Sequence, residues 1–231
     1  MGLRITQTYI IRISSASSRL KAEGCFASAL ENGLTPQYLE GVEQMSCDDV
    51  FAKFGYQRAE THYGFAAECC SYGSNILAWQ KIANSDSAAL ILEDDTVVLG
   101  DITHLEIEDY GIYTFGYRTK DRDTYTPPGT AKGFENIPRL LGIHAYAITP
   151  KTAQWLLDHI EQNGAIYPLD RWLMRHEIHE HRGVYNTLPL FMCDPPQIVA
   201  WVRDSSIVTD GQGKYKNVPD SIIPSWLEGL K

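Results

Sequence analysis

The sequence lacks any long apolar run, and this absence excludes a helix that crosses a membrane. The longest strongly apolar stretch is Ala88–Leu92, whereas a spanning helix needs about 20 residues. The first residues show no apolar segment with a cleavage pattern, so we expect no signal peptide. With 44% hydrophobic and 21% charged residues among 231, the composition is that of a folded domain with a substantial core.

Positive charge is also scarce. The chain has 20 Lys and Arg residues against 29 Asp and Glu residues, which gives a formal net charge of −9. Proteins that bind nucleic acid do so largely through contacts of Lys and Arg with phosphates. The charge balance therefore disfavours general nucleic-acid binding.

Cysteines are few, and their pattern does not indicate a disulfide framework. The five are Cys25, Cys47, Cys69, Cys70 and Cys193. An odd number with one vicinal pair, together with the absence of a C-x-x-C motif, disfavours both disulfides and a zinc ribbon. No Asn-x-Ser/Thr sequon occurs. We therefore expect buried thiols and a reducing, cytoplasmic location.

Segments typical of strands and helices alternate along the chain. Strands are predicted at 7–13, 88–92, 110–116, 142–149 and 183–192, and helices at 16–31, 46–55, 65–83, 150–162 and 168–181. A long mobile loop is predicted at 118–138, and irregular structure after the last strand. The alternation indicates an α/β fold with a mostly parallel central sheet flanked by helices. We expect one domain over 1–210 and an irregular tail over 211–231.

The most informative motif is Glu93-Asp94-Asp95, which follows the apolar run directly. Ligands of open α/β sheets bind beyond the carboxyl ends of the strands. Mg²⁺ and similar cations take one or two carboxylates together with substrate phosphates. A cation site and a solvated turn are both consistent with three adjacent acids. The stretch 176–181, HEIHEH, has no pair of His at i and i+4, so it predicts a polar helix end rather than a zinc site.

Residues 68–98 resemble the centre of glycosyltransferase family 25, the lipopolysaccharide-type enzymes that are similar to collagen galactosyltransferase domains. Ser74 and Trp79 stand at family positions on a helix, and the next strand ends in the Glu-Asp-Asp motif. Weaker similarity extends over about residues 7–207, through YIIRISSASSR, GIHAYAITPKTAQWLL, YPLDRWL and the Ser-Ile pair at 206–207. Two departures are Cys70-Ser71 for the family's Gly-Cys and Asn75 for its His.

The resemblance implies a GT-A-like nucleotide-diphospho-sugar transferase fold. It implies metal-dependent, inverting transfer of galactose or glucose from a UDP-hexose donor to a hydroxyl of a carbohydrate or other acceptor. Mn²⁺ or Mg²⁺ would be held by Asp95 with Glu93. Asp170 would be the base that takes the acceptor proton, with His144 as its competitor. The residues that the resemblance places around the donor are Arg12, Ser14, Arg19, Ser74, Asn75, Glu93 and Asp94.

Other interpretations stay open. Asp170 also suits the start of a helix, where a negative charge stabilises the helix dipole. A HAD-type phosphohydrolase needs an Asp nucleophile with a second Asp two residues later, whereas the pair here is Glu93 and Asp95. A degenerate transferase fold that binds sugar or protein without turnover is the main alternative, because Asn75 replaces the family's His.

Overall fold

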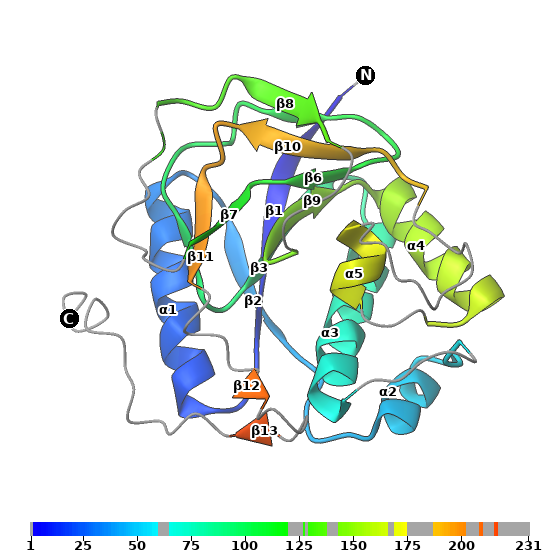
Figure 1. Ribbon diagram of the computed structural model, residues 1–231. Helices are drawn as coiled ribbons and strands as arrows, with labels where there is room; N and C mark the ends of the chain where they lie inside the picture. Colours follow the sequence, from blue (N-terminus) through cyan, green and yellow to red (C-terminus); the bar gives the residue numbers. More distant parts are fainter. Residues whose placement is uncertain are drawn as a thin grey trace.

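The computed structural model describes residues 2–59, 65–119, 127, 129–137, 143–165, 169–174, 187–201, 208–209 and 215–216. Helices and strands alternate in the first part of the chain, whereas the described elements between 88 and 148 are all strands (Figure 1). In chain order the elements are β1 (Leu3–Arg12), α1 (Ala16–Glu31), β2 (Pro36–Glu40), α2 (Cys47–Lys53), α3 (Ala66–Ala83), β3 (Ala88–Glu93), β4 (Thr96–Val98), β5 (Glu106–Ile107), β6 (Ile112–Thr114), β7 (Gly116–Thr119), β8 (Gly133–Asn136), β9 (Ala145–Ile148), α4 (Pro150–Asn163), α5 (Leu169–Met174), β10 (Leu190–Asp194), β11 (Ile198–Trp201), β12 (Val208–Thr209) and β13 (Tyr215–Lys216).

An eight-stranded mixed sheet forms the centre of the molecule (Figure 1). Its strand order is β2-β1-β3-β9-β6-β10-β8, and β5 pairs with the start of β1. The strands β2, β1, β3, β6 and β10 share one direction, and β9, β8 and β5 run against them. The predicted α/β fold, with a central sheet flanked by helices and most strands in one direction, is confirmed.

Both faces of the central sheet are covered, so β3 is apolar from Ala88 to Leu92. Ala89 and Ile91 pack into a core with α3, α4 and α5, whereas Leu90 and Leu92 pack with α1 on the other face. A smaller sheet of order β4-β11-β7 lies on the α1 side. Alternate residues of one strand therefore belong to two separate cores, as the pleat of a strand requires.

Local capping signals in the sequence explain where the helices begin. The Ser15 side chain caps α1, Ser46 caps α2, and Thr149 caps α4 with Pro150 in its first turn. After α1 the chain turns through Gly33 at φ 77°, which suits glycine. The helices predicted at 16–31, 65–83 and 150–162 match the structure to within one residue at each end.

Several strands were not predicted. β2 was missed, β8 lies in the segment predicted as a loop, and β11 lies in the C-terminal part predicted as irregular. The two-stranded β12–β13 pairing joins residues on either side of the domain boundary predicted at 210, and that boundary stays a prediction. Residues 120–126, 128 and 138 of the predicted loop, the HEIHEH stretch, Pro168 and the Ser-Ile pair at 206–207 lie outside the described residues.

The cysteines correct one prediction and support another. Cys47 and Cys69 form a disulfide that joins the starts of α2 and α3, so the expectation of thiols alone was wrong. Cys25, Cys70 and Cys193 are buried thiols. Burial raises the pKa of both Cys25 and Cys193 to about 12. The disulfide has no local signal in the sequence, because its partners are 22 residues apart and meet only when α2 packs on α3.

In the part of the chain that the structure describes, no helix is both long and apolar enough to cross a membrane.

Candidate functional site

Three neighbouring strands bring a glutamate, a histidine and a glycine into one row across the sheet. The backbone N–H of Glu93, at the end of β3, donates to the carbonyl of His144, just before β9, at 2.9 Å. β6 pairs with the other side of β9, with Thr114 opposite Tyr146. Extending this pairing by two residues places Gly116 opposite His144. Residues directly opposite in an antiparallel pair lie on the same face of a sheet. Glu93 and His144 therefore share the face that α3, α4 and α5 cover.

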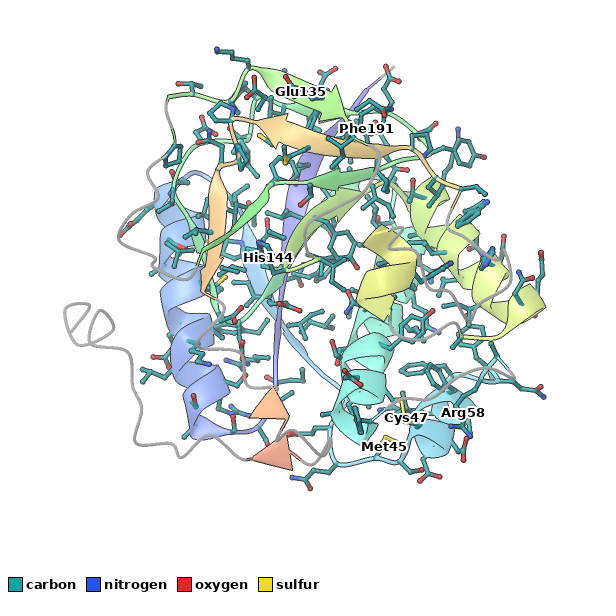
Figure 2. All side chains as sticks on the ribbon, viewed as in Figure 1. Met45, Cys47, Arg58, Glu135, His144 and Phe191 are labelled. Atoms are coloured by element: carbon teal, nitrogen blue, oxygen red, sulfur yellow. A yellow bond between two sulfur atoms is a disulfide. The ribbon has the colours of Figure 1, made fainter. Side chains whose placement is uncertain are left out.

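The His144 ring occupies the space that a side chain at position 116 would fill. A Cβ added to Gly116 would lie 2.1 Å from Nε2 of His144, closer than any real contact. His144 is only 3% exposed, and Figure 2 shows it in the middle of the molecule, beside the strands. The absence of a side chain at Gly116 thus allows the imidazole to lie in this position on the sheet.

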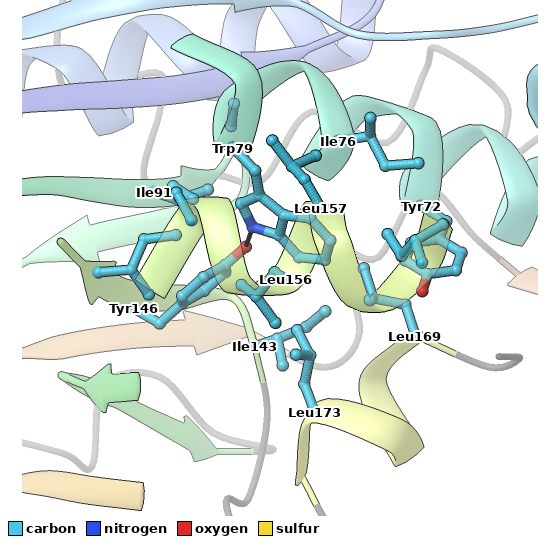
Figure 3. Packing of buried hydrophobic residues seen from close by; sticks show 14 of the residues in the cluster. Tyr72, Ile76, Trp79, Ile91, Ile143, Tyr146, Leu156, Leu157, Leu169 and Leu173 are labelled. Carbon is cyan, nitrogen blue, oxygen red and sulfur yellow. Dashed lines mark hydrogen bonds between the residues drawn. The ribbon is translucent and has the colours of Figure 1, made fainter. Parts of the chain in front are cut away.

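A buried hydrogen-bonded chain lies on the same face, two residues further along β9. The indole N–H of Trp79 donates to the hydroxyl of Tyr146 at 2.8 Å, and this hydroxyl donates to Oδ1 of Asn75 at 2.6 Å. The Asn75 amide donates to the carbonyl of Ser71 at 3.0 Å. Figure 3 shows the bond between Trp79 and Tyr146 within the apolar packing of α3 and α4. Burial raises the pKa of Tyr146, so its hydroxyl stays neutral.

Ser74, the neighbour of Asn75, joins α3 to the end of β2. Its hydroxyl donates to the carbonyl of Cys70 at 2.8 Å and accepts from the backbone N–H of Val42 at 2.9 Å. It is 2% exposed. The structure thus places Ser74 and Asn75 on the face that carries Glu93 and His144, with their polar atoms bonded to the protein. Their contact with a donor stays a prediction.

Asp94 lies on the opposite face from Glu93. Its side chain is buried against α1 and accepts a hydrogen bond from the Ser18 hydroxyl. Burial raises the pKa of Asp94, and this is opposed by the Ser18 bond and by the positive charge of Lys21. Glu93 and Asp95 are only partly buried. The three adjacent acids are therefore not equivalent, because the middle one is directed into the α1 core.

The predicted donor residues near the end of β1 are paired with glutamates. Nε and Nη2 of Arg12 donate to one oxygen of Glu40 at 2.8 and 2.6 Å, and the guanidinium lies 3.7 Å from the centre of the Tyr38 ring. Arg19 approaches the other oxygen of Glu40 at 3.7 Å. The Ser14 hydroxyl and backbone N–H both donate to Glu43. These residues do meet at one strand edge, the edge where β3 ends, since β1 and β3 are parallel neighbours.

Asp170, the predicted base, lies in the first turn of α5. The apolar residues Leu169, Trp172 and Leu173 pack this helix into the core that α3 and α4 share. In Figure 1, α5 lies over the same face of the sheet as α3 and α4. The side chain of Asp170 lies outside the described residues, so its role stays a prediction.

The carboxylates at the end of β3 suit a cation that takes few ligands from the protein. Among the described residues, no group of three or more His, Cys, Asp or Glu is arranged to hold a metal ion. The two carboxylates left by the burial of Asp94 are Glu93 and Asp95, on either side of it. Mg²⁺-type ions are commonly held by one or two carboxylates, with phosphates and water completing the shell. The residues therefore fit a cation that arrives with a diphosphate, not a site built by protein alone.

Sequence reasoning missed Gly116, Tyr146, Ser18 and Lys21. Only Ser18 and Lys21 had a readable signal, because a hydroxyl and an ammonium group on the same helical face as Ala22 and Cys25 are unusual in a core-facing helix. Gly116 and Tyr146 matter through contacts with residues far away in the sequence.

Glycosyltransferases are among the solved structures to which this chain is similar. The glycosyltransferase GlyE of Streptococcus pneumoniae TIGR4 matches with 13% identity and a TM-score of 0.33, over 68% of this chain and 39% of GlyE. Its apo form matches with 12% identity and a TM-score of 0.35, over 69% and 39%. The galactosyltransferase LgtC, in complex with donor and acceptor sugar analogues, matches with 12% identity and a TM-score of 0.36, over 70% of this chain and 66% of LgtC. This chain thus spans well under half of the length of GlyE.

No protein-family model matches the sequence, and no curated protein sequence matches it. Membership of glycosyltransferase family 25 stays a prediction from the resemblance.

Proposed function

We propose that the protein is a glycosyltransferase that moves a hexose, galactose or glucose, from a UDP-sugar to an acceptor hydroxyl, with inversion and with the help of Mn²⁺ or Mg²⁺. The observation that carries the proposal is the position of Glu93 and Asp95. Glu93 ends a strand that is otherwise buried, at the carboxyl edge of an α/β sheet, and Asp95 lies in the turn after it, where ligands of such sheets bind. The resemblance to family 25 supplies the reaction and the donor.

Glu93 and Asp95 would hold the cation, which when bound would neutralise the charge that develops on the diphosphate leaving group. The two carboxylates are close in sequence and partly exposed at the end of β3, so they are able to bind a ligand that comes from solvent. The nearby Arg12, Ser14 and Arg19 lie at the end of β1, beside β3. They offer donors that would orient the nucleotide.

Inversion requires a base that takes the proton of the acceptor hydroxyl as its oxygen bonds to the sugar carbon and the bond to the diphosphate breaks. We favour Asp170 in the first turn of α5. His144 is the competitor, but it is 3% exposed and packed on Gly116, which limits the approach of an acceptor. Its buried position between Glu93 and Gly116 suits a residue that supports the site by packing.

The direct test is the release of UDP from a panel of UDP-sugars with Mn²⁺. We expect hydrolysis or transfer with UDP-galactose or UDP-glucose, loss of activity in EDTA, and loss in Asp95→Ala with little change in stability. Asp170→Asn should lower turnover by about 10²-fold or more while UDP binding is kept. Full activity in EDTA, or a clear preference for a CMP- or GDP-sugar, would overturn the proposal. If His144→Ala lowers the rate and Asp170→Asn does not, His144 is the base in place of Asp170.

A non-catalytic module is the second candidate, and the bonding of Asn75 favours it. The side chain that replaces the family's His is bonded to Ser71 and Tyr146 within the core. Binding of a UDP-sugar without any turnover over the whole panel would support this function over catalysis.

A further inference from the structure

Helix α1 carries a row of polar side chains that follows the segment from the acidic turn to β4. The Ser18 hydroxyl donates to Asp94, and Cys25 Sγ lies 3.2 Å from the hydroxyl of Thr96. Further along the helix, the Ser28 hydroxyl accepts from the backbone N–H of Val98 at 3.1 Å. At the end of the helix, Asn32 donates to the carbonyl of the same residue at 3.1 Å.

These side chains lie on one face of the helix. Positions 18, 21, 25, 28 and 32 are separated by alternating steps of three and four residues, which is the spacing of a single helical face. Ser18, Lys21 and Cys25 are all buried. Burying polar groups is costly unless they are bonded, so such a row favours only one register between the helix and the segment beside it.

Two members of this row, Ser18 and Lys21, act on Asp94. Its carboxylate accepts from the Ser18 hydroxyl, and Lys21 brings a positive charge to it. Ser18 also accepts from the backbone N–H of Ile13 at 2.9 Å. The same hydroxyl therefore connects the end of β1 to the acidic turn after β3.

A hydrogen bond within the turn also stabilises it. The Thr96 hydroxyl donates to the carbonyl of Glu93 at 2.8 Å, and Thr96 is fully buried. Asp94 and Thr96 thus face α1. Glu93, which precedes Asp94, and Asp95, which lies between Asp94 and Thr96, remain partly exposed. A shift of Asp94 would move both of its neighbours.

We propose that Asp94 is a positioning residue, held by Ser18 and Lys21 of α1, which fixes the turn so that Glu93 and Asp95 are presented to the ligand. This inference rests on the proposed function and differs from the resemblance in one detail, since the resemblance placed Asp94 among the residues that bind the donor. Ser18 and Lys21, which that resemblance did not include, become determinants of ligand affinity. Small displacements of binding groups have large effects on such sites.

The test changes the α1 side of the contact and leaves the acids in place. Ser18→Ala and Lys21→Met are compared with the control Ser28→Ala, which removes a hydroxyl from the same face of the same helix but at its far end. Each variant is assayed by thermal unfolding and by the dissociation constant of UDP in the presence of Mn²⁺, at a temperature where all are folded. Ser18→Thr, which keeps the hydroxyl, serves as the rescue.

We expect all three variants to unfold at lower temperature than the wild type. Only Ser18→Ala and Lys21→Met should weaken Mn²⁺-dependent UDP binding, by about tenfold, and Ser18→Thr should restore most of it. Equal effects of all three variants on UDP binding would overturn the proposal, because they would show a general loss of structure. Loss of UDP binding in Asp94→Asn with unchanged thermal stability would also overturn it, because Asp94 would then be a direct ligand.

A measurement without ligand separates this inference from the proposed function. In the double-mutant cycle of Ser18→Ala and Asp94→Asn, the two decreases in melting temperature should add to clearly more than the decrease of the double variant. Additive decreases would overturn the contact between α1 and the turn. If the wild type binds no UDP with Mn²⁺ while the cycle is non-additive, the donor assignment fails and the coupling of α1 to the turn is retained.

Discussion

Gly116 lies where the neighbouring His144 leaves no room for a side chain. A Cβ there would meet the His144 ring at 2.1 Å, so Gly116→Ala must displace the imidazole or the strand. Overfilling a packed site of this kind costs about 1–3 kcal/mol. We expect a loss of that size in the free energy of unfolding, measured by urea denaturation.

The matching double variant identifies the cause. If the clash with the imidazole is responsible, Gly116→Ala should cost much less in a His144→Ala background than in the wild type. An equal cost in both backgrounds would mean that the backbone at position 116 rejects the Cβ by itself.

Tyr146 holds two buried groups with one hydroxyl. Tyr146→Phe would leave the Trp79 indole N–H and the Asn75 carbonyl oxygen without this partner, and an unpaired buried polar group costs about 1–3 kcal/mol. We therefore expect a decrease of about 2 kcal/mol or more in the free energy of unfolding. Tyr9→Phe is the control, because the partly buried hydroxyl of Tyr9 donates to the side chain of Gln7, and its loss should cost less than half as much. Equal costs would show that the chain from Trp79 to Asn75 adds nothing to stability.

The sequence allowed the acids to be placed but not to be distinguished. An apolar run followed by Glu93-Asp94-Asp95 predicts a strand end with acids, and that was confirmed. Which acid is buried depends on Ser18, 76 residues away. The same holds for Asn75, whose partner Tyr146 is 71 residues away. A motif records residue types, whereas these assignments depend on which elements pack together.

At the scale of elements, α5 is attached to α4 by stacked rings. The His159 ring lies between Trp155 and Trp172, with ring centres 5.0 and 5.1 Å apart and interplanar angles of 25° and 29°. Within the described residues, Nε2 of His159 and the indole N–H of Trp172 have no hydrogen-bond partner. The attachment of α5, which carries Asp170, thus depends on packing of rings and not on hydrogen bonds at these atoms.

This stack predicts a dependence of stability on pH. Burial lowers the pKa of His159 below its ordinary value of 6.5, so the unfolded chain takes up a proton at a higher pH than the folded one. Stability therefore falls as the pH decreases through that ordinary value. Between about pH 7.5 and pH 5.5, the melting temperature of the wild type should fall by more than that of His159→Phe. Equal decreases would show that His159 is protonated as readily in the folded state as in the unfolded chain.

Helices were easier to predict than strands for a local reason. The caps Ser15, Ser46 and Thr149 act within one turn of the helix that they begin, so the sequence contains the whole signal. β2, β8 and β11 are each four or five residues long, and each exists through pairing with a strand elsewhere in the chain. Short strands of this kind have little periodicity of their own.

At the scale of the whole molecule, the central sheet separates two tasks. The α1 face holds the acidic turn through Asp94, and the opposite face carries Glu93 and His144. The residues that fix the position of the turn are therefore buried, whereas Glu93 and Asp95, which are proposed to hold the cation, are partly exposed. Substitutions on the α1 face should affect stability and affinity together, and those at Asp95 should affect activity almost alone.

The disulfide gives a prediction for the chain as a whole. It closes a loop with a sequence separation of 22, and a loop of that length stabilises a fold by about 3 kcal/mol through the lost entropy of the unfolded chain. Reduction should lower the free energy of unfolding of the wild type by about that amount. The double variant Cys47→Ala, Cys69→Ala should not respond to the reductant.

Counting thiols with Ellman's reagent tests the same pairing without any variant. The native protein should react slowly, because Cys25, Cys70 and Cys193 are buried and burial raises the pKa of each thiol. After unfolding without reductant, these three thiols should react. After unfolding and reduction, all five cysteines of the chain should react. Five reactive thiols before reduction would mean that Cys47 and Cys69 are unpaired in solution and that the expectation from the odd cysteine count was right. Three reactive thiols before reduction would mean that Cys47 and Cys69 are paired because α2 packs on α3, contrary to the expectation from the odd cysteine count.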